Sequence, residues 1–270
     1  MNILVTLNIK YLQQLEIMLH SILNTNPGVH LDVYIISKEL QENDVFDLKG
    51  RMNSPLLMFH LLHFDDTLLV GAPTSARYPL EIYYRLFAAK VLPPEVNRVL
   101  YLDPDIVVLK SLESLYNSDF EGNYFIGATH VRNFLRALNR LRVKAKTNAH
   151  YINTGVMLMN IEKLREEQST QEVYDFINKK KLVLTLPDQD IIFALYGDKI
   201  KLVDHLLYNL SDRMLTVENL KIGRKINLEW VKDNTVIIHY CGRNKPWRSK
   251  YRGVLDVFYK EIETKILSYH

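Results

Sequence analysis

The sequence predicts an α/β protein in which helices flank one mixed, mostly parallel β-sheet. From the first residues onward, short apolar runs typical of strands alternate with segments of helical period. No repeat, low-complexity stretch or linker rich in Pro, Gly and Ser divides the 270 residues, and a hydrophobic content of 47% suffices for one large core. We therefore expect one domain over residues 1–249, followed by a helical tail over 250–270 that packs on the domain or extends it.

The individual elements follow from the periodicity of the apolar residues. In the first part of the chain, strands are expected at 2–7, 31–37 and 56–62, and helices at 12–24, 38–50 and 80–91. Gly50 is the expected end of the second helix. Two apolar runs around a charged triplet come next, and further strands are expected at 123–129, 152–160 and 235–240. Crossovers between parallel strands are right-handed, and ligands bind beyond the carboxyl ends of such strands.

The bulk properties exclude several classes of protein. A net charge of +3 is too small an excess to indicate nucleic-acid binding. The single cysteine, Cys241, can form no disulfide within the chain and favours a reducing compartment. The chain opens on the strand-like run Ile3–Val5 rather than on a signal peptide, and no window reaches the roughly 20 apolar residues of a membrane span. These features predict a cytoplasmic protein.

A basic segment over residues 131–150 departs from the alternating pattern. Arg132, Arg136 and Arg140 recur every four residues, so they share one face of a predicted helix. We interpret this face as solvated, since runs of charge usually are. The alternative is a surface that binds a substrate or faces a membrane.

Asp103 and Asp105 flank Pro104 between two apolar runs, Val99–Leu102 and Ile106–Leu109. Two carboxylates beside a core strand are costly unless a cation or good hydrogen bonds compensate their charge. Pro104 stiffens the turn, so both carboxylates can point at one place beyond the strand end. Such oxygen ligands suit Mg²⁺ or Mn²⁺, with substrate phosphates completing the shell. The alternative is that Asp103 caps the next segment and Asp105 is an ordinary turn residue.

A second polar cluster follows the apolar run Thr235–Ile238. His239 lies at the expected strand end, and an imidazole beside two carboxylates favours Mn²⁺ over Mg²⁺. Gly242 lets the backbone approach a ligand closely, and Lys245 could neutralise a diphosphate. The alternative is a core histidine followed by a glycine turn and a surface lysine, but the polar residues are grouped too densely to favour it.

Two further segments fit a sugar-binding site. Asn153 and Gly155 interrupt an apolar run, and a glycine within a strand marks a bulge or a ligand close to the backbone. The Asn153 amide can both donate to and accept from a sugar hydroxyl. Asp188, Gln189 and Asp190 open an apolar helix. Helix capping explains one acidic residue there, whereas a sugar-binding rim explains three polar side chains in succession.

In the order of these motifs the chain resembles glycosyltransferase family 8, which includes bacterial lipooligosaccharide galactosyltransferases and glycogenin. The resemblance runs from residue 2 to about 250. It is carried by the N-terminal strand with Tyr11, Arg85 within YYRLFAAKVLP, Asp103-Pro104-Asp105, Asn153-Thr154-Gly155, Asp188-Gln189-Asp190 and the highly specific His239-Tyr-Cys-Gly-x-x-Lys-Pro-Trp.

The resemblance implies a GT-A fold and a retaining transfer of a hexose, glucose or galactose, from a UDP-sugar to a saccharide or glycolipid acceptor. It places Mn²⁺, or Mg²⁺ in its stead, on Asp103, Asp105 and His239. The substrate-binding residues that it implies are Thr6, Asn8, Tyr11, Arg85, Asp103, Pro104, Asn153, Thr154, Gly155, Asp188, Gln189, Gly242 and Lys245. The sequence departs from the family after its first strand, where Lys10 replaces the usual asparagine near the uracil and ribose.

The resemblance places Gln189 near the reacting carbon and leaves Asp190 as a candidate nucleophile. Because an amide is a weak nucleophile, we favour front-face substitution over a covalent glycosyl-enzyme. In front-face substitution the leaving phosphate helps to deprotonate the acceptor.

Other functions stay open on the sequence alone: a UDP-sugar-binding protein that has lost catalysis, a nucleotide-sugar hydrolase and a self-glucosylating primer. The tail from Trp247 onward is rich in Arg, Lys and Tyr. We interpret it as an ordinary terminal helix, with peripheral contact to an anionic membrane as the alternative.

Overall fold

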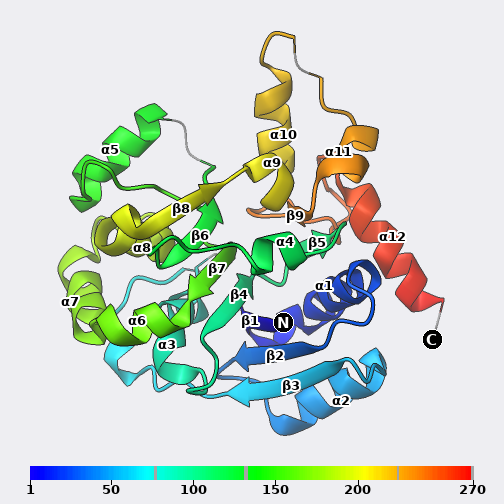
Figure 1. Ribbon diagram of the computed structural model, residues 1–270, viewed down its shortest axis with the longest axis horizontal. Coiled ribbons are helices and arrows are strands. Elements are labelled where there is room, and N and C mark those ends of the chain that lie inside the picture. The colour runs from blue at the N-terminus through cyan, green and yellow to red at the C-terminus, as the bar shows by residue number, and fades with distance from the viewer. Residues whose placement is uncertain (76–77, 131–132, 224, 269–270) are drawn as a thin grey trace.

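Residues 1–75, 78–130, 133–223 and 225–268 are described by the computed structural model. Within them, seven strands form one sheet in the order β3-β2-β1-β4-β7-β6-β8, in which β7 alone runs antiparallel to its neighbours (Figure 1). The strands are β1 (Asn2–Thr6), β2 (Leu31–Ile36), β3 (Leu57–Leu62), β4 (Arg98–Leu102), β6 (Phe125–Ala128), β7 (Val156–Asn160) and β8 (Ile200–Val203). The predicted mixed, mostly parallel α/β sheet is therefore confirmed.

Helices cover both faces of this sheet because its central strands bury side chains on both sides. In β1, Ile3 and Val5 face one core cluster and Leu4 faces the other, as the two-residue period of a strand requires. The first cluster is closed by α1 (Leu12–Thr25), α2 (Glu42–Met52) and α4 (Glu113–Tyr116). The second is closed by the 3₁₀ helix η3 (Leu80–Phe87), α3 (Ala88–Val91), α6 (Ile161–Glu167), α7 (Thr170–Lys180) and α8 (Pro187–Tyr196). Short 3₁₀ helices are η1 (Ile9–Tyr11), η2 (Thr67–Leu69) and η4 (Gly197–Lys199).

A smaller antiparallel pair of strands lies beside the main sheet. β5 (Ile106–Val108) follows β4 closely and pairs with β9 (Ile237–His239), so that Ile106 lies opposite His239. The helices of the last third of the chain pack around this pair: α9 (His205–Tyr208), α10 (Asp212–Asn219), α11 (Leu228–Asn234) and α12 (Asp256–Leu267). This register brings His239 to the turn that carries Asp103 and Asp105.

The helix predicted over 38–50 is α2, but its predicted end is wrong. Gly50 lies inside the helix, which continues to Met52. Asn53 ends it with a left-handed φ of 39°, a conformation that asparagine adopts more readily than most residues.

Two other predicted elements also differ from the structure. The helix predicted over 80–91 is mostly the 3₁₀ helix η3, and only its last turn is α-helical. The strand predicted over 152–160 begins at Val156. Asn153 and Thr154 therefore lie in a loop before the strand, at the edge of the sheet where ligands bind.

The basic segment forms α5 (Asn133–Val143), apart from Arg132, which lies outside the described residues. The predicted solvated arginine face is wrong, since Arg136 and Arg140 are half-buried. The exposed side of the helix is instead apolar and carries Leu135, Leu138 and Leu141. Val143 is buried at the end of the helix and fixes which side faces the protein.

The C-terminal tail contains α12, which lies against α1 and contributes Phe258 and Tyr259 to the core. Within the described residues, no helix combines the length and apolar content that crossing a bilayer requires.

Candidate active site

Asp103, Asp105 and His239 form one cluster beyond the carboxyl end of β4. The carboxylates flank the buried Pro104 in the turn before β5, and His239 is the last residue of β9. His239 Nε2 lies 3.2 Å from Asp105 Oδ1 and 3.6 Å from Asp103 Oδ2. One ligand atom of each residue lies within 4.8 Å of the others. Two motifs far apart in the sequence thus meet at one point.

Burial and neighbouring charges together set the protonation of this cluster. Burial opposes ionisation of both carboxyls, but Arg85 holds the pKa of Asp103 below its ordinary value and Lys245 does the same for Asp105. Burial also opposes a charge on His239, yet the adjacent Asp105 outweighs it and raises the pKa of His239 to about 10. The two carboxylates therefore hold a positive charge between them, which is the environment that a cation requires.

Gly155 makes room for the cluster. It lies in the turn before β7, where its carbonyl accepts a hydrogen bond of 2.8 Å from the Asp103 N–H. A Cβ at this position would lie 2.2 Å from His239 Cε1 and 2.6 Å from Asp103 Oδ2, far inside van der Waals contact. Both side chains therefore reach their positions only because residue 155 has no side chain.

His239 is oriented by Asn209, which the sequence analysis misses. His239 Nδ1 lies 3.0 Å from Asn209 Oδ1, and Asn209 Nδ2 donates to Asn153 Oδ1 at 3.2 Å. Because the Asn209 oxygen can only accept, Nδ1 carries a hydrogen and Nε2 is the atom that faces the carboxylates. Asn209 is fully buried, and its position within the apolar run Leu206–Leu210 is the signal that could have identified it.

Replacing Asn209 with alanine is expected to weaken Mn²⁺ binding by about 10- to 100-fold, because His239 loses the partner that fixes its ring. Electron paramagnetic resonance during titration of chelator-treated protein with Mn²⁺ measures this affinity. Asn26→Ala is the matched control, since Asn26 is also buried but bonds to Leu112 and Ile22 instead. Equal Mn²⁺ affinity in the Asn209 variant and the wild type would contradict the orienting role.

Lys245 reaches the cluster from the loop after β9. Its Nζ contacts Asp105 and donates to the Tyr240 carbonyl at 3.0 Å, and the residue is 8% exposed. Burial opposes its charge, but the Asp105 carboxylate outweighs burial and raises the pKa of Lys245, so the ammonium stays charged. Gly242 has a φ of 98°, which the turn between the strand and Lys245 requires.

Arg85 links this cluster to the start of α8. From η3 its guanidinium lies 3.1 Å from Asp103 Oδ1 and 3.3 Å from Asp188 Oδ2. It also donates to the Thr154 carbonyl at 3.1 Å, and the Thr154 hydroxyl donates to Asp188 at 2.5 Å. Burial raises the pKa of Asp188, an effect that the positive charge of Arg85 opposes. The arginine, itself buried, thus holds two carboxylates in fixed positions.

Asp190 lies deeper than the other two residues of its triplet. It is fully buried and accepts hydrogen bonds from the Arg142 guanidinium, the Tyr151 hydroxyl and the backbone N–H groups of Thr185 and Leu186. Both of its oxygens are engaged, so the geometry argues against the nucleophilic role considered from the sequence. Asp190 instead ties the end of α5 to the start of α8.

Asp190→Asn is expected to destabilise the fold by about 3 kcal/mol or more, because it leaves the Arg142 guanidinium without its buried counter-ion. Urea unfolding followed by circular dichroism measures this change. Asp198→Asn is the control, since Asp198 pairs with the exposed Lys146. This substitution should lower the free energy of unfolding by less than about 1 kcal/mol. A fully stable Asp190 variant without transferase activity would instead restore the nucleophilic interpretation.

Tyr101 links Thr6 to the cluster through hydrogen bonds. The Thr6 hydroxyl lies 2.9 Å from the Tyr101 hydroxyl, which donates to Asp103 Oδ1 at 2.8 Å. Gln189 is half-buried at the start of α8, next to Asp188.

The remaining predicted residues of this region, Asn8 and Tyr11, lie in the segment after β1. The Asn8 side chain accepts a hydrogen bond from the Lys10 N–H at 3.2 Å and caps η1, while Lys10 itself is exposed. The Tyr11 and Trp247 rings are perpendicular, with 6.3 Å between their centroids. Tyr11 therefore joins this loop to the loop that carries Lys245.

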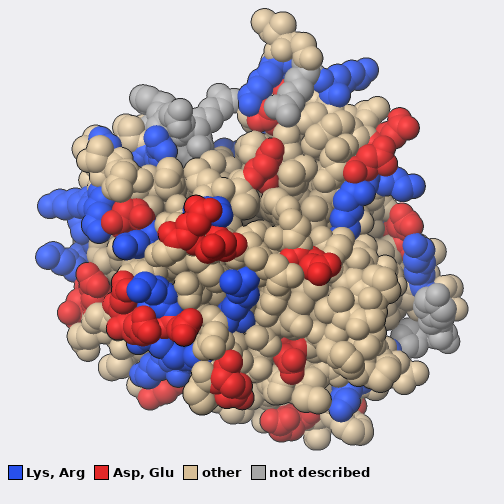
Figure 2. Space-filling model, in the orientation of Figure 1, with Lys and Arg blue, Asp and Glu red and all other residues tan. Residues whose placement is uncertain are grey.

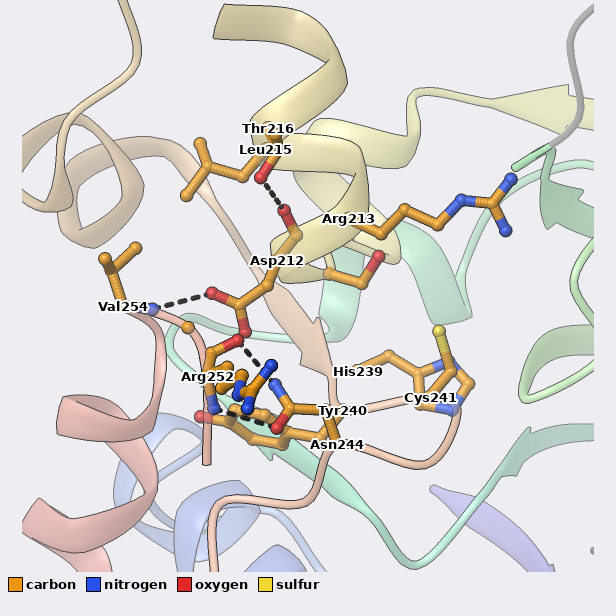
Figure 3. Close-up of a pocket in the computed structure, with 12 residues that line it drawn as sticks. Asp212, Arg213, Leu215, Thr216, His239, Tyr240, Cys241, Asn244, Arg252 and Val254 are labelled. Carbon is orange, nitrogen blue, oxygen red and sulfur yellow. Dashed lines mark hydrogen bonds between the residues drawn. The ribbon is translucent and has the colours of Figure 1, made fainter. Parts of the chain in front are cut away.

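A cavity of about 330 Å³ opens beside His239 (Figure 3). It lies between α10, the end of β9 and the segment 252–254. Its polar lining is formed by Ser211, Asp212, Arg213, Thr216, His239, Asn244 and Arg252. Asp212 closes one wall by accepting hydrogen bonds from the Val254 N–H, at 2.8 Å, and from the Tyr251 hydroxyl. The sequence analysis did not identify this cavity.

The fold and the site together define a GT-A glycosyltransferase. The structure of LgtC, a galactosyltransferase solved with donor and acceptor sugar analogues, superposes with a TM-score of 0.83 at 20% identity, over 98% of this chain and 96% of that one. The sequence model of glycosyl transferase family 8 matches residues 2–251. The chain belongs to glycosyl transferase family 8, and the resemblance noted in the sequence is confirmed.

Proteins similar in sequence to this chain occur in distantly related organisms. A lipopolysaccharide 1,2-glucosyltransferase of Escherichia coli is 27% identical over 84% of this chain and 67% of its own length. A probable galacturonosyltransferase-like protein of Arabidopsis thaliana is also 27% identical, over 91% of this chain and 73% of its own length.

Proposed function

We propose that this glycosyltransferase moves a hexose, glucose or galactose, from a UDP-sugar to a saccharide or glycolipid acceptor, with the help of a divalent metal ion. The observation that carries the proposal is the buried cluster of Asp103, Asp105 and His239 with Lys245 beside it. The similarity to a lipopolysaccharide glucosyltransferase favours an acceptor of the lipopolysaccharide type. Family membership favours a nucleotide-sugar donor and retention of the anomeric configuration.

The residues of the cluster fit a divalent ion. Two carboxylates and one imidazole form a ligand set that suits Mn²⁺, with Mg²⁺ as the alternative. Gly155, which lacks a Cβ, leaves room for His239 and Asp103, and one ligand atom each of these two residues and of Asp105 lies within 4.8 Å of the others. When bound, such an ion offsets the negative charge that develops on a departing nucleoside diphosphate.

The chain's own residues supply the rest of the donor site. Lys245 is a fixed ammonium next to Asp105 and is suited to a phosphate oxygen. Arg85 keeps Asp188 and Asp103 in place, and we assign it a positioning role. The proposed contacts with the sugar are Asn153, Asp188 and Gln189, and Gly242 is proposed to lie with Lys245 at the diphosphate. Further proposed substrate-binding residues are Thr6, Asn8, Tyr11, Pro104, Thr154 and Gly155.

We favour front-face substitution for the reaction, since Asp190 is fully engaged in the structure. The bond between the anomeric carbon and the UDP oxygen breaks, and its electron pair stays on the β-phosphate. The acceptor oxygen bonds to the same face of that carbon, and its proton passes to the leaving phosphate. Configuration is retained because entry and departure share one face.

The cavity beside His239 is the proposed acceptor site. Its volume of about 330 Å³ is at the lower end of the range typical of ligand pockets. Its carboxylate, amide, hydroxyl and guanidinium groups match the donors and acceptors of a saccharide.

A screen of UDP-sugars for Mn²⁺-dependent release of UDP, with and without truncated lipopolysaccharide cores, tests the proposal. We expect one UDP-hexose to react about tenfold faster or more when the acceptor is present, and the acceptor to gain the mass of one hexose. Release of free hexose at the same rate in both conditions would indicate a hydrolase. Binding of UDP without turnover, or a hexose added to the protein itself, would also overturn the proposal.

A further inference from the structure

The segment after α10 projects from the molecule, and its base is clamped. In Figure 1 it lies at the top of the view, beyond the end of α10. At the base, Asn219 Nδ2 donates to the Ile226 carbonyl at 2.9 Å, and Asn219 Oδ1 accepts from the Ile226 N–H at 2.6 Å. Ile226 is buried in the C-terminal core. Two hydrogen bonds and one buried side chain thus anchor the base of the projection.

The tip of this projection, residues 220–223, is apolar with cations beside it. Ile222 is fully exposed and Leu220 is 75% exposed, although both are aliphatic. Lys221 and Lys225 are exposed on either side, and Lys221 also pairs with Glu218. Figure 2 shows the end of the projection in tan with blue side chains below it. Exposed apolar patches rimmed by polar residues mark sites of contact with proteins or membranes.

The tip also lies at the outer end of a path that starts at the candidate active site. Leu215 and Val254 line the cavity beside His239. They also line a second hollow, together with Lys221, Gly223, Lys225 and Leu228. The two hollows therefore adjoin, and the second reaches the base of the tip.

We propose that residues 220–223 insert into the surface of an anionic lipid bilayer and so hold the acceptor cavity at that surface. Ile222 and Leu220 would enter the boundary between headgroups and acyl chains, while Lys221 and Lys225 meet anionic headgroups. A protein partner fits less well, because two side chains cannot provide the roughly 800 Å² per partner of a stable protein interface. The role in acceptor delivery rests on the proposed function, whereas contact with the bilayer does not.

Two other surfaces, on α12 and α5, are weaker candidates for contact with a bilayer. α12 buries Phe258 and Tyr259 against the core, and its exposed aliphatic residues, Val257 and Leu267, lie near opposite ends of the helix. α5 exposes Leu138 and Leu141, but no residue of α5 lines either hollow among the described residues. The tip combines exposed aliphatic residues, flanking cations and a path to His239.

Co-sedimentation with vesicles, without donor or acceptor, tests the proposal. We expect the wild type to bind vesicles of equal parts phosphatidylglycerol and phosphatidylcholine, and to bind pure phosphatidylcholine much less. Leu220→Ser/Ile222→Ser should lower the partition coefficient about tenfold or more. Lys221→Gln/Lys225→Gln should lower it several-fold and reduce its sensitivity to salt. Phe46→Ser is the matched control, since Phe46 is 74% exposed on α2, at the opposite end of the view in Figure 1.

Insertion depth gives a second readout. Tryptophan fluorescence of Ile222→Trp should be quenched by lipids brominated on their acyl chains, whereas Phe46→Trp should show only the background of the two native tryptophans. Three results would overturn the proposal: no binding of the wild type to anionic vesicles, full binding by Leu220→Ser/Ile222→Ser, or loss of binding only in Leu138→Ser/Leu141→Ser. Transfer of hexose to a soluble saccharide should be unchanged in the tip variants. If the wild type itself transferred no hexose, that result would count against the proposed function and not against contact with the bilayer.

Discussion

Asp105→Asn is expected to lower the rate of hexose transfer at least about a thousandfold while the chain stays folded. The substitution keeps the shape of the side chain but removes the charge that His239 and Lys245 both face, at 3.2 Å from His239 Nε2. A cation then loses one of its three protein ligands, and the Lys245 ammonium loses its counter-ion. UDP release from the preferred UDP-hexose measures the rate, and far-ultraviolet circular dichroism checks the fold.

Glu16→Gln is the matched control for this prediction. Glu16 is a buried carboxylate paired with an arginine, Arg51, at 2.9 Å, but it lies on α1 and outside the cluster. Its variant should keep nearly the wild-type rate. Asp105→Asn with at least half of the wild-type rate would show that the carboxylate takes no part in transfer.

Gly155→Ala is expected to lower transfer by about a hundredfold or more, because a misplacement of about 1 Å at reacting groups costs about that much. The added Cβ would lie 2.2 Å from His239 Cε1, so the imidazole or the backbone has to move. The free energy of unfolding should fall by about 1–3 kcal/mol, because overpacking a buried site destabilises the folded state. Steady-state kinetics and thermal unfolding measure the two effects separately.

Gly50→Ala provides the comparison. Gly50 lies inside α2, and a Cβ there meets no atom within 4 Å. Alanine should therefore leave the transfer rate unchanged and stabilise the helix by about 0.5–1 kcal/mol. If both glycine variants kept the wild-type rate, the tight contact of Gly155 with the cluster would have no functional role.

The fold and the centre of the site could be predicted because short-range patterns determine both. Apolar runs of four to six residues with helical segments between them define a parallel sheet, and polar residues that follow strands must lie at its carboxyl edge. Asp103, Asp105 and His239 each follow such a run, and the structure brings them together. The family motif around His239 strengthened the same conclusion.

Features that depend on tertiary contacts could not be predicted. Asn209 is one buried amide in an apolar run, and only the packing of α9 against β9 brings it to His239. In α5 the arginine spacing suggested a solvated face, yet burial of Val143 turns the leucines outward instead. Asp190 carried a polar pattern shared with its neighbours, but its burial and hydrogen bonds give it a structural role.

Direct counting of bound Mn²⁺ tests the central claim most directly. Chelator-treated protein is titrated with Mn²⁺ in the presence of UDP, and free Mn²⁺ is followed by electron paramagnetic resonance. The cluster of Asp103, Asp105 and His239 predicts one tightly bound ion per chain, which is lost in Asp105→Asn and in His239→Gln. One tightly bound ion in both variants, or none in the wild type, would contradict the account.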